Sequence, residues 1–269
     1  MLETLYQWKK LIMFDYFWKI RYLWIIAHVS AIYSTLQAPE YFLYALLWGA
    51  FATMLGSYAG WHRYWAHRSY KTDKFRQNIL TWAGILGCTG KPITVIAGHR
   101  IHHKYSDQEH DIHSPRDRKW WEILYGFYEE KELPKGSRKM MMDLIRDPHM
   151  QFIQQHYFKI ISVFILILAL INPLLVGYVF GFAALYSLYA SVFIINYLLH
   201  IHGHQSHETG DDSKNNWFLN IIALGEGWHN NHHNNSLSYT TKDKWWQFDP
   251  TGLFIKYFIA TDLKHDNLY

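Results

Sequence analysis

The chain has 269 residues, 50% of them hydrophobic and 18% aromatic, and its formal net charge is only +4. This length suits one large domain, and no basic run is long enough to indicate a nucleic-acid partner. The single cysteine, Cys88, excludes an internal disulfide, so nothing indicates an oxidising compartment. The 13 Trp and 20 Tyr residues are typical of a protein whose amphipathic rings lie at a membrane interface.

Four apolar stretches are predicted to be membrane helices, at 22–36, 41–60, 157–171 and 174–201. A helix needs about 20 mainly apolar residues to cross a bilayer, and the first stretch is short by that measure. Pro39 separates the first two stretches and Pro173 the last two, because proline removes a helix donor and favours a turn. The N-terminal segment has no signal-peptide pattern. We therefore predict two retained helical hairpins within a single domain that covers 1–269.

Lys and Arg are distributed unevenly between these stretches. The turns around Pro39 and Pro173 contain none, whereas the N-terminal, middle and C-terminal segments contain many. The positive-inside rule then places both termini and the segments 61–156 and 202–269 in the cytoplasm. Within the last segment, 206–216 is polar and is predicted to be a surface loop.

Three short histidine clusters lie on this predicted cytoplasmic side. They read H-R-Y-W-A-H, H-R-I-H-H and H-N-N-H-H, and their histidines are His62, His67, His99, His102, His103, His229, His232 and His233. Imidazole is a common ligand of iron, copper, nickel and zinc. Eight imidazoles are too many for one four-coordinate zinc, so the clusters predict two metals in one shared site.

The spacing within each cluster indicates how its side chains converge. Histidines at i, i+3 and i+4 share one helix face, as in the second and third clusters. His62 and His67 are five residues apart, which a regular helix splays by about 140°. We therefore predict that the second membrane helix extends past the bilayer and that its last turn loosens. Small residues earlier in this helix, such as Gly49 and Gly56, either leave room for an acyl chain or pack against another helix.

Carboxylates are scarce in these clusters. Only Glu226-Gly-Trp-His229 matches the Glu-x-x-His motif of soluble di-iron bundles, and no H-E-x-x-H zinc-protease motif is present. A histidine-rich, carboxylate-poor site favours iron and dioxygen over zinc hydrolysis. Metal-bound imidazoles are usually oriented by nearby acceptors. The candidates are Asp107, Asp111 and Glu226, and the alternative for each is a solvated surface carboxylate.

Together these strings resemble the membrane fatty-acyl desaturases of the stearoyl-CoA desaturase type. The matching segments are 60–68, 99–107, 196–200, 225–233 and 245–252. The resemblance implies an all-α integral membrane fold, with four membrane helices under a helical cytoplasmic cap that holds two irons. It also implies a ninth histidine ligand, His200, and a residue that approaches one iron through water, Asn196.

The reaction that this resemblance implies is oxygen-dependent insertion of a cis double bond into a long saturated acyl chain, commonly at the delta-9 position, in unsaturated fatty acid biosynthesis. An unactivated methylene has no acidic proton, so the oxidising power has to come from a metal–oxygen species. The partners are then an acyl-CoA or acyl-lipid substrate, the lipid bilayer and a separate electron donor of the ferredoxin or cytochrome type. Lys135, Arg138 and Lys139 either dock such a donor or coenzyme A phosphates, or form a solvated face.

Two other functional classes stay open. A histidine-box hydroxylase of alkanes, sterols or carotenoids shares the metal chemistry, although the Asn196 and His200 match favours the desaturase. A non-catalytic lipid-binding or metal-storing membrane protein would keep its function without His102 or His232. The chain also departs from the family, since Ile112 stands where proline is common, and this leaves acyl carrier and chain length open.

Overall fold

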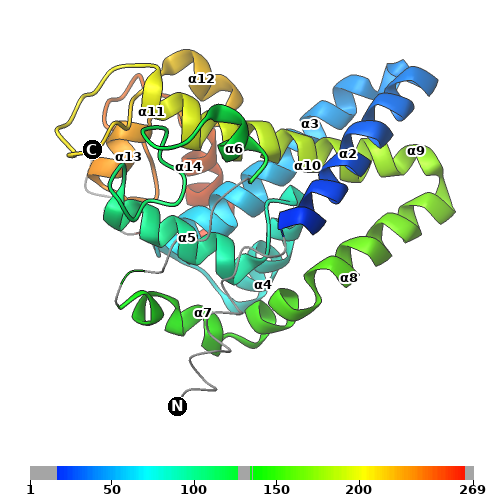
Figure 1. Ribbon diagram of the computed structural model, residues 1–269, viewed down its shortest axis with the longest axis horizontal. Coiled ribbons are helices and arrows are strands. Elements are labelled where there is room, and N and C mark those ends of the chain that lie inside the picture. The colour runs from blue at the N-terminus through cyan, green and yellow to red at the C-terminus, as the bar shows by residue number, and fades with distance from the viewer. Residues whose placement is uncertain (1–16, 127–133, 135, 264–269) are drawn as a thin grey trace.

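The computed structural model describes residues 17–126, 134 and 136–263. In this part of the chain the fold is mostly helical, which confirms the all-α part of the predicted class. The strands are two short segments, β1 (Tyr70–Lys71) and β2 (Asp262–Leu263), which pair antiparallel. Long helices extend to one side of the molecule, and short elements gather into a cap at the other end (Figure 1).

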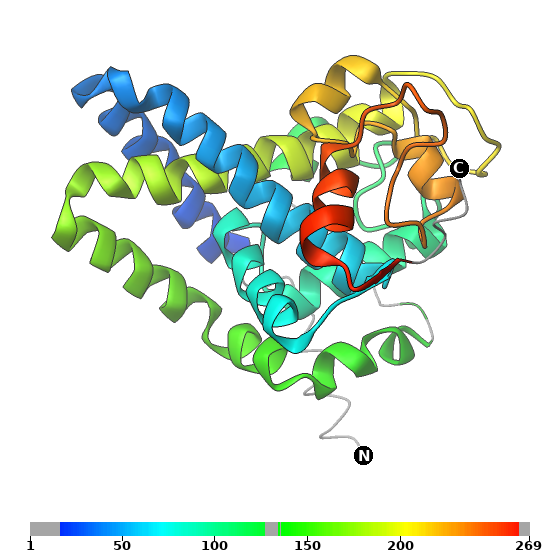
Figure 2. The ribbon, with the colours of Figure 1, turned by 180° about the vertical axis from the view of Figure 1, so that it is seen from behind.

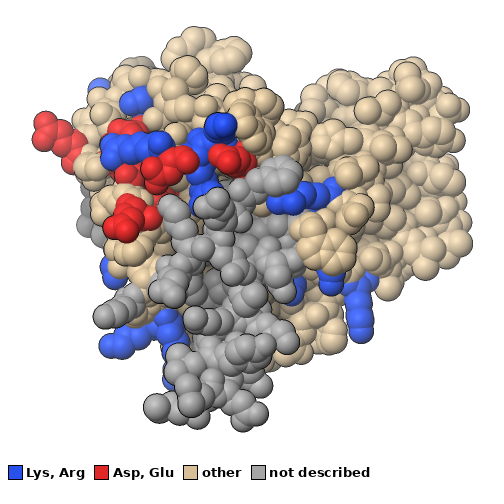
Figure 3. All heavy atoms as spheres, in the orientation of Figure 1, with Lys and Arg blue, Asp and Glu red and all other residues tan. Residues whose placement is uncertain are grey.

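Three helices in the described residues are long and apolar enough to cross a membrane: Pro39–Ala66, Pro148–Ile171 and Pro173–Ile201. The first is built from η2 (Pro39–Tyr41), α3 (Phe42–Ala52) and η3 (Thr53–Ala66). The second is α8, Pro148–Ile171. The third is built from α9 (Pro173–Leu175), η6 (Val176–Gly181), α10 (Phe182–Ser187), η7 (Leu188–Leu198) and α11 (Leu199–Ile201). Figure 3 shows very few charged side chains on the half of the molecule that the long helices form, which agrees with membrane association.

The first predicted stretch, 22–36, lies within α2 (Phe17–Gln37), and α2 is not among these three helices. Two further helical segments, Lys74–Gly87 and Pro92–Tyr105, pass the same test only as a pair bent by 89°. The structure therefore contains a helix at each of the four expected stretches, and three of these helices are long and apolar enough to cross a membrane.

The long helices start where local capping directs them. The Asp147 carboxylate accepts a hydrogen bond from the Met150 amide at 3.0 Å, and Pro148 occupies the first helical position. Helix α8 therefore starts well before the predicted residue 157, because the helix capping by Asp147 and Pro148 outweighs the polar residues of the first turns. The Asn172 side chain caps the following helix in the same way, by accepting from the Leu174 amide at 3.0 Å.

The cap consists of short helices from the two segments before and after the hairpin that runs from α8 to α11. Between η3 and α8 they are α4 (Lys74–Ala83), η4 (Gly84–Gly87), α5 (Pro92–Tyr105), α6 (Trp120–Leu124), η5 (Ser137–Met141) and α7 (Met142–Arg146). After α11 they are α12 (Trp217–Ile222), α13 (His229–Asn234), α14 (Pro250–Phe254) and η8 (Ile255–Ile259). Figure 2 shows the last of these, in red, lying against η3, the cap end of the first long helix.

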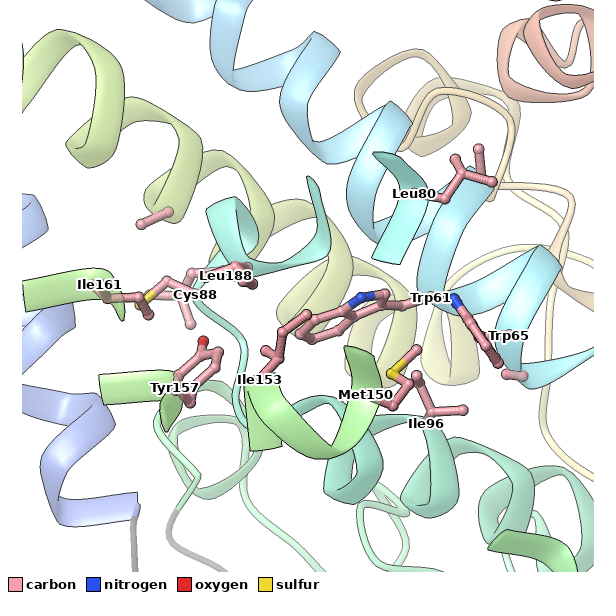
Figure 4. Close-up of a cluster of buried hydrophobic side chains, with 14 of the residues drawn as sticks. Trp61, Trp65, Leu80, Cys88, Ile96, Met150, Ile153, Tyr157, Ile161 and Leu188 are labelled. Carbon is pink, nitrogen blue, oxygen red and sulfur yellow. The ribbon is translucent and has the colours of Figure 1, made fainter. Parts of the chain in front are cut away.

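A buried apolar cluster anchors η3 between α4, α5 and α8 (Figure 4). Trp61 and Trp65 both lie in it, and their indole N–H groups donate to the carbonyl and hydroxyl oxygens of Thr81 at 3.0 and 2.9 Å. A Cβ atom at Gly84 would lie 2.1 Å from the Trp61 ring, so only glycine fits there. Because Trp61 and Trp65 are fixed, the opposite side of η3 is held in place as well.

The small residues of the first long helix, Pro39–Ala66, also permit close helix packing. A Cβ atom at Gly49 would lie 2.6 Å from the Phe182 carbonyl oxygen, and one at Gly56 would lie 2.4 Å from the Ala83 carbonyl oxygen. Neighbouring backbones therefore fill the space at both positions. These glycines therefore serve close helix packing and do not leave room for an acyl chain.

Candidate metal centre

The nine predicted histidines come together in two groups. Group one contains His62, His67, His99, His103 and His232, and group two contains His102, His200, His229 and His233. In each group, one ring nitrogen per residue lies within 4.8 Å of those of all the other members. The residues come from η3, α5, α11 and α13, so two long helices and two cap helices build the site together.

His62 and His67 converge because η3 is a π-helix. The His67 amide donates to the His62 carbonyl at 3.1 Å, which is an i+5 to i bond, and the two ring centroids are 4.8 Å apart. In this helix type, residues five apart lie one above the other instead of being splayed. The predicted loosening of the last turn is confirmed, and it extends over all of η3, Thr53–Ala66.

The other two clusters are each divided between the groups. On α5, His99 and His103 belong to group one and His102 to group two. On α13, His232 belongs to group one and its neighbours to group two. A sequence cluster therefore does not correspond to one metal position, and both helices lie between the two groups.

Pairs of Nε2 atoms face one another at short distances within each group. The distances are 2.8 Å for His67–His99, 3.0 Å for His62–His232, 3.1 Å for His103–His232 and 3.1 Å for His200–His229. A neutral imidazole carries a single N–H, so the position of that proton decides whether these contacts attract or repel.

Carboxylates next to the Nδ1 atoms determine that position. Asp107 lies 2.8 Å from His200 Nδ1, Asp111 lies 2.9 Å from His102 Nδ1, Asp211 lies 2.6 Å from His233 Nδ1 and Glu226 lies 3.3 Å from His62 Nδ1. Each carboxylate favours the N–H on Nδ1 and leaves the Nε2 lone pair facing into its group.

Lone pairs that face one another in a buried site repel unless a cation lies between them. In group two, the Nε2 atoms of His102 and His233 are buried and have no hydrogen-bond partner among the described residues. Buried polar atoms are rarely left in this state. The donor set therefore fits a metal ion in each group, and imidazole suits iron among other transition metals.

The electrostatics keep these side chains in the protonation states that metal binding requires. Burial disfavours ionisation of Asp107, Asp111 and Asp211, yet hydrogen bonds and charge interactions with the neighbouring histidines hold the pKa of each carboxyl well below its usual value. Burial lowers the pKa of His232 well below the ordinary value and that of His233 to about 4. Burial therefore favours the neutral form of His232 and His233 at pH 7, the form in which imidazole binds a metal.

Asp211 lies beside His233, and the sequence did not reveal this neighbour. It lies in segment 206–216, which is a loop with Ser206, Glu208 and Gly210 exposed, as predicted. The prediction misses the buried part of this loop. Ser213 and Asn215 in this segment are fully buried, and the Asn215 side chain donates to Asn231 at 2.6 Å. The segment folds onto α13 because its amides and hydroxyls satisfy that helix, and no spacing pattern in the sequence indicates this.

A buried ion network connects the first histidine cluster to the C-terminal segment. Arg63 Nε lies 2.9 Å from Glu226 Oε1, and Arg63 Nη1 lies 2.8 Å from Asp249 Oδ2. All three side chains are almost completely buried. Glu226 thus contacts both Arg63 and His62, so the segment that contains Asp249 helps to hold the group-one end of η3.

An apolar cavity of about 150 Å³ borders group one. Its wall includes Trp61, Ile96 and Ile195, and its polar end includes His62 and His99 together with Asn196 and His113. Asn196 thus lies beside group one but belongs to neither histidine group. The cavity can hold a hydrocarbon segment next to a metal-binding group, away from water.

This arrangement defines a helical protein of the histidine-cluster type, in which two histidine groups fit metal ions and one of them borders an apolar cavity. The family model described as "Fatty acid desaturase" matches residues 39–250, and the chain belongs to that family. It is therefore an oxidoreductase that acts on fatty acyl substrates.

Several relatives are similar over most of the chain. Delta-9 acyl-lipid desaturase 2 of Arabidopsis thaliana is 33% identical over 85% of this chain and 78% of its own length. The sn-1 stearoyl-lipid 9-desaturase of Anabaena variabilis is 32% identical over 78% of this chain and 79% of its own. Acyl-CoA 5-desaturase AL21 of Anemone leveillei is 30% identical over 85% of this chain and 75% of its own. Their names differ in acyl carrier and in double-bond position.

Proposed function

We propose that this protein is an integral membrane, di-iron acyl desaturase that inserts a cis double bond, at the delta-9 position, into a long saturated acyl chain. The observation that carries the proposal is that two adjacent histidine groups fit metal ions and that group one borders the apolar cavity. Two of the relatives named above are 9-desaturases of acyl lipids, which supports both the position and the substrate class.

One iron is proposed for each histidine group, with all nine histidines as ligands. When bound, the irons supply the oxidising power by activating dioxygen. Asn196 contributes through a water molecule on the cavity side of group one. Asp107, Asp111, Asp211 and Glu226 orient the imidazoles through Nδ1, so that the Nε2 lone pairs point to the metals.

The protein's own part in the reaction is to position the substrate and exclude water. The cavity is smaller than the roughly 300–1,000 Å³ of typical ligand pockets, so it holds the reacting segment of the chain and not the whole substrate. Two hydrogens leave the substrate, and dioxygen also takes up two protons and two electrons to give two water molecules. The two electrons have to come from a separate donor protein.

The proposed membrane arrangement has four crossings: α2 and the three helices Pro39–Ala66, Pro148–Ile171 and Pro173–Ile201. Helix α2 has 21 residues, and at 1.5 Å per residue this is about 31 Å, which matches a hydrocarbon core of about 30 Å. Many of its large apolar side chains are exposed, including Tyr22, Val29 and Leu36. Both termini and the cap lie in the cytoplasm.

Product analysis tests the reaction. The purified, iron-loaded protein receives an electron donor, oxygen and a stearoyl substrate, offered in parallel as the coenzyme A thioester and as a lipid ester. We expect a cis-monoene from one of the two carriers, with the double bond located by mass spectrometry. An alcohol as the main product would contradict desaturation and support the hydroxylase alternative.

A further inference from the structure

A shallow, open cleft of about 610 Å³ borders group one at residues that do not line the apolar cavity. It is formed by the end of η3, by α5 and by the segment that leads into α7, and its lining residues include His67, His103, Arg68, Arg100, Lys139 and Arg146. The two hollows have no lining residue in common. Group one is therefore approached from two separate sides.

Four of the five histidines of group one are divided between these sides. His62 and His99 line the apolar cavity, whereas His67 and His103 line the cleft. The members of group two line neither hollow, as far as the described residues show. Whatever binds in the cleft is therefore in contact with the imidazoles of group one and separated from the hydrocarbon site.

The cleft is basic. Four cationic side chains, Arg68, Arg100, Lys139 and Arg146, line it with one carboxylate, Asp143, which gives a charge of +3 without the histidines. Arg100 Nη1 lies 2.8 Å from Asp143 Oδ1, and Arg68 pairs with the same carboxylate. The negative charge of Asp143 is therefore already neutralised. Lys139 and Arg146 are exposed. In Figure 3 the visible charged side chains around α7 are basic, whereas the acidic ones lie higher on the cap.

We propose that this cleft is the docking site for the acidic face of the electron-donor protein, and that electrons enter group one through its His67 and His103 side. This inference rests on the proposed function, because oxygen-dependent desaturation requires two external electrons. A positive concave surface attracts and orients an acidic redox protein. The anionic head group of the substrate is a weaker candidate, since it has to remain connected to a chain in the other hollow.

Donor binding tests the inference on both metal-free and iron-loaded protein in detergent. The probe is a plant-type 2Fe–2S ferredoxin, titrated at low ionic strength. The variants Lys139→Glu and Arg146→Glu each change the net charge by −2 without touching a histidine. Lys244→Glu is the matched control, since Lys244 is also an exposed cap residue but lies outside the cleft. Lys139→Arg is the conservative variant.

We expect each reversal in the cleft to weaken ferredoxin binding on the order of tenfold, and the loss to shrink when salt screens the charges. Lys244→Glu and Lys139→Arg should bind like the wild type, and iron content should stay unchanged in all variants. Unchanged binding in both cleft variants, or equal weakening by Lys244→Glu, overturns the docking site.

Two further outcomes separate this inference from the proposed function. A higher KM for the acyl substrate in the cleft variants, with unchanged ferredoxin affinity, assigns the cleft to the head group of the substrate and overturns donor docking. An alcohol as the wild-type product contradicts desaturation but leaves the docking result intact, because hydroxylation requires the same two electrons.

Discussion

The two histidine groups share two helices, yet they differ in their surroundings. In group two, carboxylates lie within hydrogen-bonding distance of Nδ1 in three of the four histidines, and none of the four lines a hollow. In group one, the described residues place one carboxylate, that of Glu226, next to a ring nitrogen. Four of the five histidines of this group line a hollow. Group two is thus enclosed and firmly oriented, whereas group one is accessible to substrate and donor.

The largest expected effect comes from removing one histidine from each group. His232→Ala in group one and His229→Ala in group two should each lower activity at least about 100-fold, because even the partners that orient ligands account for 10–100-fold. Metal analysis should show that each variant loses iron from its own group first. His207→Ala is the control, since His207 pairs with Asp243 outside both groups. The non-catalytic alternative would instead be supported if the wild type showed no desaturation and His232→Ala kept the lipid or metal binding of the wild type.

A smaller effect is expected when one orienting carboxylate of group two is neutralised. Asp211→Asn replaces a charged acceptor of the His233 N–H by a neutral amide, so we expect iron affinity to fall about 10–100-fold at one of the two positions. Competition with a chelator measures it. The adjacent Asp212→Asn is the matched control, because Asp212 pairs with the half-exposed Arg116. Equal iron loss in both variants would show that Asp211 does not act through His233.

Overpacking beneath η3 should affect group one more than group two. Gly84→Ala places a methyl group against the Trp61 ring, and such overpacking costs about 1–3 kcal/mol. The thermal midpoint in detergent should fall, and iron should be lost from group one before group two. Gly98→Ala is a milder control, because its new methyl group meets only the flexible end of Ile112 at 2.8 Å. Equal midpoints for the two variants would mean that Trp61 does not fix η3.

The smallest expected effect is the change in stability of the metal-free protein with pH. Unfolded histidine has a pKa of about 6.5, and burial lowers the pKa of folded His233 to about 4. Between these values the unfolded chain binds more protons, so stability falls as pH decreases. Thermal midpoints at pH 7.5 and 5.0 should show this loss, and His233→Gln should reduce it. A midpoint that does not change over this range would contradict neutral, buried imidazoles in the metal-free fold.

Several features of the fold follow from residues that are close together in the sequence. The helices around Pro39 and Pro173 follow from proline and from long apolar runs, and the i, i+3, i+4 histidines follow from helix periodicity. The early start of α8 is also local, since Asp147 and Pro148 are a standard helix start, although hydropathy alone does not indicate it.

The sequence by itself determined the helical class and eight of the histidines that come together, because these depend on composition, periodicity and residue spacing. The family and the ninth histidine, His200, came from the resemblance of its motifs. Only the tertiary structure decided how α5 and α13 divide their histidines between two groups, and that Asp211 lies beside His233. It also decided that group one lies between an apolar cavity and a basic cleft. These features depend on contacts between residues far apart in the chain, and no local pattern encodes such contacts.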